Sequence, residues 1–100
     1  MTFIIENIDL IKLCQTGTNK LLKLPEVVID FFMMRLECIL SAYDYSDIEN
    51  DIALNPVKKR GRNQILLRII DNWKIDAELI INKESNKIES IFIKNIIQIK

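Results

Sequence analysis

The residues best suited to chemistry in this 100-residue chain are a group of cations in its second half. The whole chain has zero formal net charge, but acidic residues dominate from 26 to 51. Between 55 and 75 the one acidic residue is Asp71, and the basic residues are Lys58, Lys59, Arg60, Arg62, Arg68 and Lys74. Cations that converge on one surface bind phosphates, with an affinity that falls as salt is added. The cluster therefore predicts a phosphate-rich partner; the alternative is a solvated loop with a few surface bases.

Other kinds of chemistry have little support. The chain has no His and two Cys, Cys14 and Cys38, which together make no recognisable zinc site or nucleophilic triad, so no metal or cofactor is expected. Both Cys lie among apolar residues of expected helices, which favours buried free thiols over a disulfide and fits a reducing cytoplasm. The start MTFIIENIDL has no basic leader, and no run of about 18 apolar residues occurs. We therefore expect a cytoplasmic protein without a membrane span.

The elements that position the cations follow from the apolar spacing. TFII near the start predicts a strand, after which Asn7 can cap a helix that stops at Gly17. A long helix is expected from Pro25, with one broad apolar face. It should end near SAYDYSD, and a further helical turn is possible before Asn55-Pro56, where extended backbone is expected.

From Gln64 onward the apolar period becomes two, which indicates strands. Asp71-Asn72 predicts a tight hairpin turn into WKIDAELII, and NKESNK separates that strand from IESIFIKNIIQI. The last strand could form an edge that is open to pairing. The sequence thus predicts a single α+β domain over residues 1–100, with β-α-α-β-β-β order and two N-terminal helices packed on one face of a small antiparallel sheet.

Several segments also occur in an order that is found in a known family. They are Gln15-Thr16-Gly17, the helix from Pro25, Leu54-Asn55-Pro56-Val57-Lys58, Arg60-Gly61-Arg62, and the run from Ile69 to Ile75 around Trp73-Lys74. From Thr16 to Leu79 the chain resembles the HigB branch of the RelE/ParE toxin superfamily. That family has a TG-containing turn, a long second helix, a Pro and Lys element, a basic Gly loop and a Trp-Arg pair.

The resemblance implies a toxin of a toxin–antitoxin pair that enters the ribosome, cleaves mRNA there and so inhibits translation. It assigns the catalytic positions to Lys58, to Arg68 or a residue near it, and to Lys74, all cations suited to the charge that builds on a phosphate during cleavage. RNA contacts would come from Lys59, Arg60, Arg62 and Trp73. The implied partners are a helix-turn-helix antitoxin, the ribosome and mRNA, and no cofactor is implied.

The departures from the family pattern concern proton transfer. HigB-like toxins often carry a His in the loop, where this chain has Asn55, and end on an acidic residue, Tyr and His, where it has Asn95 to Lys100. Attack of a ribose 2′-hydroxyl on the neighbouring phosphate needs a base and an acid. Lys58 or Lys74 could take those roles, the ribosome could supply the groups, or cleavage could be slow or lost. Tyr43 and Tyr45 are expected to be cap or rim residues.

Three functions therefore stay open: an mRNA endonuclease, a relative that only binds RNA or antitoxin, and an inhibitor of DNA gyrase like the ParE branch. The missing His and Tyr favour the second or third. The Asn-Pro-Val-Lys loop and the Trp-Lys turn favour the first. Trp73 could stack on a base, but packing is the expected role for a Trp on a half-buried strand. The apolar band from Phe31 to Met34 is expected to be mostly core, although part of it could accept an antitoxin segment.

Overall fold

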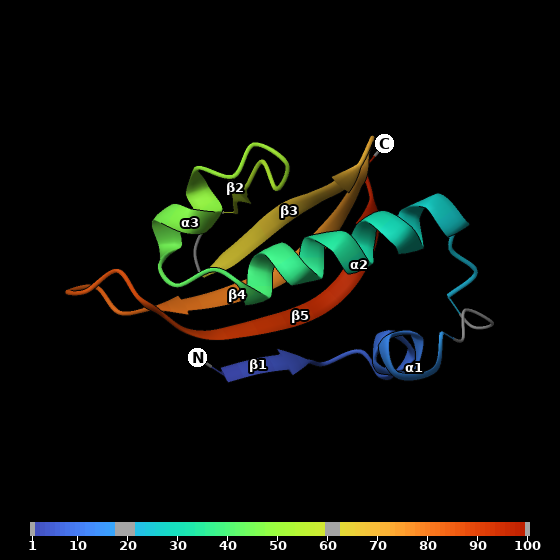
Figure 1. Cartoon of the computed structure of the whole chain (residues 1–100), viewed down its shortest axis with the longest axis horizontal. Coiled ribbons are helices and arrows are strands. Elements are labelled where there is room, and N and C mark those ends of the chain that lie inside the picture. Colours follow the sequence, from blue (N-terminus) through green and yellow to red (C-terminus); the bar gives the residue numbers. More distant parts are fainter. Residues whose placement is uncertain (1, 18–21, 60–62, 100) are drawn as a thin grey trace.

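The computed structural model describes residues 2–17, 22–59 and 63–99. Helices lie against one side of a twisted sheet (Figure 1). The strands are β1 (Thr2–Ile5), β2 (Val57–Lys58), β3 (Gln64–Ile70), β4 (Trp73–Ile81) and β5 (Ile88–Gln98). The helices are α1 (Ile8–Thr16), α2 (Glu26–Leu40) and α3 (Tyr45–Glu49). The α+β class is confirmed. The predicted order lacked two elements of the described chain, α3 and β2.

The sheet is mixed, with the strand order β1-β5-β4-β3-β2. Strands β2 to β5 are antiparallel neighbours, but β1 runs parallel to β5, with Thr2 opposite Ser90. The prediction of an antiparallel sheet was therefore wrong, and β5, considered as a possible edge, lies between β1 and β4. A parallel pair needs a long crossover connection, and here nearly the whole chain separates the two strands. Local patterning carries no information about such a pairing.

The ends of α1 are those that the sequence predicted. The Asn7 side-chain oxygen accepts hydrogen bonds from the backbone N–H groups of Asp9 (2.9 Å) and Leu10 (3.3 Å). Gly17 adopts the left-handed conformation at φ 73° and donates its N–H to the Leu13 carbonyl at 2.9 Å. Pro25 occupies the N-cap of α2. These signals are local, so they could be read without the tertiary fold.

Helix α3 is the further helical turn considered above, and a reciprocal cap starts it. The Asp44 carboxylate accepts from the backbone N–H groups of Ser46 and Asp47, while the Asp47 carboxylate accepts from the N–H of Asp44. After α3 the chain returns to the sheet, where the Arg68 N–H donates to the Leu54 carbonyl at 2.6 Å. Asn55 has a φ of 38°, so the expected extended backbone there was wrong. Asn tolerates this left-handed region better than most residues.

The two faces of the sheet differ in what covers them. On the helix face, Ile65, Leu67 and Ile69 join one buried cluster with side chains from all three helices. Side chains alternate along a strand, so the residues between these point to the opposite side, which we call the open face. Its central residues are outside the buried cluster, and we define them as Gln64, Leu66, Arg68, Lys74, Asp76, Glu78 and Phe92.

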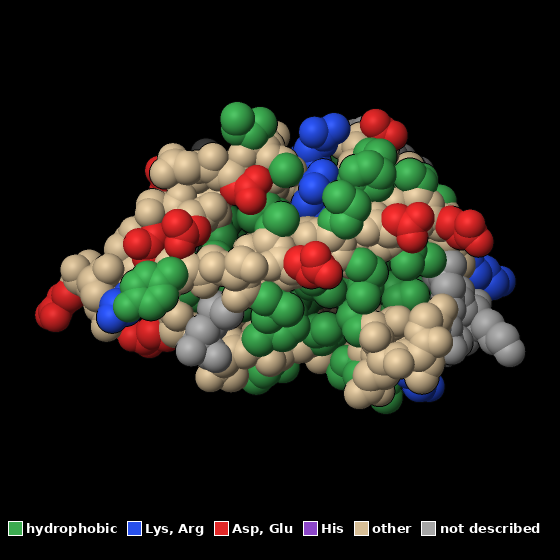
Figure 2. All heavy atoms as spheres, viewed as in Figure 1, with side chains coloured by type: hydrophobic (Ala, Val, Ile, Leu, Met, Phe, Trp, Pro, Cys, Tyr) green, Lys and Arg blue, Asp and Glu red, His purple; other side chains and the backbone are tan. Residues whose placement is uncertain are grey.

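The apolar band on α2 is core only in part. Phe32 is fully buried and Phe31 is half-buried, but Met33 and Met34 are exposed. Both cysteines are free, as expected, yet Cys38 is exposed and Cys14 is half-buried, where burial raises the pKa of its thiol. The expectation that both thiols are buried was wrong because the apolar surface of α2 is wider than the strip that the sheet covers. Figure 2 shows the resulting apolar patches between carboxylates on the helix side.

No helix in the described part of the chain has the length and apolar character that crossing a membrane requires.

Candidate nucleic-acid interface

The three cations assigned to catalysis do not share one face of the sheet. Lys58 lies opposite Ile65 in the β2–β3 ladder, and Ile65 points into the helix-face core. Directly opposite residues project to the same side of a sheet. Lys58 therefore projects to the helix side at the sheet edge. Its Nζ lies 4.5 Å from the centroid of the Tyr45 ring, in the range of a cation–π contact.

A small recess accompanies this contact. It has a volume of about 110 Å³ and is lined by Tyr45, Lys58, Asn63, Gln64, Ile65, Leu79 and Ile81. Pockets for drug-sized ligands span roughly 300–1,000 Å³. The recess can therefore admit a phosphate or a small side chain but not a nucleoside. Tyr45 was expected to be a cap or rim residue. It follows the N-cap Asp44, but it is buried and forms one wall of the recess.

Arg68 and Lys74 do come together. They are direct cross-strand partners in the β3–β4 ladder, on the open face. Side chains in such a position have Cβ atoms about 4.5–5.5 Å apart, and like charges there repel. Among the described residues, the ion pairs involve neither side chain: both join Lys94 to a carboxylate, Glu6 at 3.1 Å and Glu78 at 3.4 Å. A bound phosphate would relieve the repulsion between Arg68 and Lys74.

Arg68 also borders a shallow hollow at the edge of the sheet. The hollow has a volume of about 440 Å³ and is lined by Glu49, Asn50, Asp51, Ile52, Asn55, Pro56 and Arg68. The Asp51 carboxylate already accepts hydrogen bonds from the N–H groups of Ala53 and Leu54. Asn55 and Arg68 thus line the same hollow. The hollow is large enough for a nucleoside.

Asp76 supplies a carboxylate that sequence reasoning did not single out. It lies two residues after Lys74 on β4, so the two side chains share the open face. Its Oδ1 is buried and has no hydrogen-bond partner among the described residues. Buried polar atoms are nearly always satisfied, and an exception calls for an explanation such as an absent ligand. A carboxylate beside two cations is suited to accept a proton from a ribose hydroxyl next to a held phosphate.

The remaining predicted RNA contacts are scattered. Lys59 is exposed at the end of β2, and its backbone N–H donates to the Gln64 carbonyl at 3.1 Å. Trp73 is half-buried, lies opposite Ile70 and Gln98, and packs against the core cluster. That placement agrees with a packing role. Arg60 and Arg62 lie outside the described residues.

The residues that were missed differ in how far the sequence could have indicated them. Asp76 alternates with Lys74 in a period-two segment, so its place on the same face was readable. The sequence did not indicate that its Oδ1 lacks a hydrogen-bond partner. Tyr45 follows Asp44, a typical N-cap, but its contact with Lys58 joins elements that only the tertiary fold brings together.

No protein-family model matches this chain, and no curated protein sequence matches it.

Proposed function

We propose that this protein is a toxin of a toxin–antitoxin pair, in which the open face of the sheet binds mRNA phosphates on the ribosome and promotes cleavage. The observation that carries the proposal is the cross-strand pair of Arg68 and Lys74. Two cations held side by side with no described ion-pair partner make a site for a doubly coordinated phosphate oxygen. The resemblance to HigB-like toxins supplies the expected substrate.

The chemistry would use three neighbouring side chains. Asp76 accepts the proton of a ribose 2′-hydroxyl, and the 2′-oxygen forms a bond to the adjacent phosphorus. Arg68 and Lys74 stabilise the negative charge that builds on the phosphate oxygens. The bond to the 5′-oxygen then breaks, and the Lys74 ammonium gives that oxygen a proton. The products are a 2′,3′-cyclic phosphate and a 5′-hydroxyl, and no metal or cofactor is required.

One observation favours a second candidate, a relative that binds RNA or antitoxin without cleaving. Lys58, which the family resemblance places in the catalytic set, lies on the other side of the sheet against Tyr45. If all three cations must act on one phosphate, this arrangement is unsuited to cleavage.

The experiment is primer extension on mRNA after tightly controlled expression in translating cells. We would compare the wild type, the Arg68→Ala/Lys74→Ala variant and a Lys12→Ala/Lys83→Ala control that removes the same charge from exposed positions on α1 and the β4–β5 turn. Cuts within translated codons should occur in the wild type and the control and disappear in the site variant. Growth arrest without cuts would refute the nuclease and point to another target such as gyrase.

An Asp76→Asn variant separates the catalyst from the binder. This change keeps the shape of the side chain but removes the base, so cleavage should be lost while affinity for RNA is retained. Undiminished cleavage would exclude Asp76 as the base. Absence of both cuts and growth arrest in the wild type would favour the binding-only relative.

A further inference from the structure

The outer surface of α2 carries an apolar stripe that no described element covers. It consists of Val27, Phe31, Met34 and Cys38, which are spaced by four, three and four residues. Val27 and Met34 are 50% and 51% exposed, Cys38 is exposed and Phe31 is half-buried. Alternating spacings of three and four are those of a coiled-coil seam, so residues at these positions form one line along the helix. A partner that follows this line for its full length is itself a helix.

Acidic residues flank the stripe. Asp30 and Glu37, both exposed, are seven residues apart, at the position before each of the seam residues Phe31 and Cys38. In a coiled coil such flanking positions pair with charged residues of the partner helix and select it. On the other flank the guanidinium carbon of Arg35 lies 5.4 Å from the centroid of the Phe31 ring, within the range of a cation–π contact. Two carboxylates thus stand against one cation beside the seam, and the net charge there is negative.

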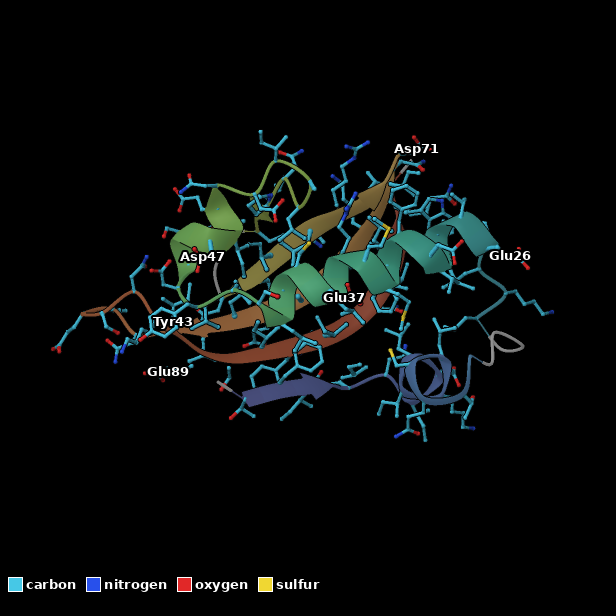
Figure 3. All side chains as sticks on the ribbon, viewed as in Figure 1. Glu26, Glu37, Tyr43, Asp47, Asp71 and Glu89 are labelled. Atoms are coloured by element: carbon cyan, nitrogen blue, oxygen red, sulfur yellow. The ribbon has the colours of Figure 1, made fainter. Side chains whose placement is uncertain are left out.

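The end of the stripe is more acidic still. A hollow of about 440 Å³ lies there, lined by Glu37, Cys38, Ser41, Ala42, Asp47 and Asp51. The last turn of α2 has no basic residue to offset the partial negative charge of its carbonyl groups. Figure 3 shows Glu26 and Glu37 along α2 and Asp47 on α3. From 26 to 51 the carboxylates Glu26, Asp30, Glu37, Asp44, Asp47, Glu49 and Asp51 stand against Arg35 alone.

From this combination we infer that α2 is the docking surface for a basic amphipathic helix of a protein partner. The apolar residues of the partner helix would pack on Val27, Phe31, Met34 and Cys38. Its Lys or Arg residues would contact Asp30, Glu37 and the acidic hollow at the end of α2. A second copy of this chain would bring the same carboxylates and be repelled. Nucleic acid and anionic lipid are excluded for the same reason. The inference depends on the fold and the charge distribution, and it stands whether or not the open face cleaves RNA.

The test measures binding of the full chain to two fluorescent peptides of about three heptads, both with Leu at the seam positions. One peptide carries Lys at the flanking positions and the other carries Glu. Fluorescence anisotropy at low salt should show that the Lys peptide binds and that the Glu peptide does not. Equal binding of the two peptides, or no binding of the Lys peptide, would refute the inference.

Variants of the chain locate the site. Met34→Gln exchanges an exposed side chain for a polar one of similar length. It should weaken the affinity for the Lys peptide about tenfold. The matched control is Ile8→Gln, because Ile8 is 64% exposed and lies on α1, outside the stripe; it should leave the affinity for the Lys peptide unchanged. The double variant Asp30→Lys/Glu37→Lys should no longer bind the Lys peptide and should bind the Glu peptide. Equal effects of Met34→Gln and Ile8→Gln would contradict the assignment, as would a wild-type dimer that Met34→Gln dissociates.

Discussion

The helix face and the open face of this sheet are built from the same strands but carry different surfaces. Over the helix face, α2 and α3 bury the core beneath them and present carboxylates and an apolar stripe to solvent. The open face is not part of the helix-covered cluster: Leu66 is buried, but Arg68 and Lys74 are half-buried and lie side by side at one end, and Lys94 lies between Glu6 and Glu78 at the other. A chain of zero net charge thus offers one surface to cations and one site to anions. Net charge describes neither surface, because electrostatic selection acts at the level of local patches.

The largest effect that separates the two faces concerns stability. Phe32 on α2 is fully buried in the helix-face core, and Phe92 on β5 is half-buried on the open face. Phe32→Ala should lower the free energy of unfolding by about 3–5 kcal/mol because it leaves a cavity. Phe92→Ala should cost about 1 kcal/mol, since solvent can replace part of the lost contact. Urea denaturation of both variants measures the difference, and similar losses would mean that the open face is also covered.

The next effect concerns where RNA binds. Lys74→Ala should lower the affinity for a single-stranded RNA oligonucleotide about tenfold at low salt. It should also reduce the slope of log affinity against log salt concentration by about the amount that one phosphate contact contributes. Lys58→Ala removes the same charge from the helix side and should have a smaller effect. Anisotropy titrations at several salt concentrations compare the two. A larger loss from Lys58→Ala would move the site to the recess beside Tyr45.

The smallest effect concerns Lys94 on β5, which contacts Glu78 on β4 and Glu6, the residue after β1. Hydrogen bonding to Glu6, against some desolvation and with help from Glu78, raises the pKa of Lys94 above the ordinary 10.5. The protonated lysine makes these contacts, so their contribution is fully present below about pH 10.5 and is lost as the pH rises through the raised pKa. Lys94→Gln should therefore destabilise the protein slightly near neutral pH.

Urea denaturation at neutral and strongly alkaline pH tests this sign. The difference in free energy of unfolding between the wild type and Lys94→Gln should shrink above about pH 10.5. A difference that is independent of pH would show that the ammonium charge does not contribute and that the packing of the Lys94 chain does.

The predictable parts of this protein are those with local causes. Asn7 and Gly17 delimit α1 because a side-chain oxygen satisfies free N–H groups and because glycine adopts a positive φ without strain. The turn at Asp71-Asn72 and the period-two strands around it were readable for the same reason, and Asp71 indeed has a φ of 51°. Of the candidate site, the pairing of Arg68 with Lys74 could not be read from that turn. With Ile70 opposite Trp73, a regular hairpin would pair Ile69 with Lys74, and the register shift between Arg68 and Ile70 brings Arg68 opposite Lys74 instead.

The sequence by itself determined the ends of α1, the β3–β4 hairpin turn and the uneven distribution of charge. Only the tertiary structure decided that β1 lies parallel to β5, that Lys58 projects to the helix side, and that Tyr45 lies beneath it. The physical reason is the range of the interactions. Caps, turns and alternation act within a few residues. The side of the sheet on which Lys58 projects depends on how a loop returns β2 to β3, and a shift of one residue there would reverse it.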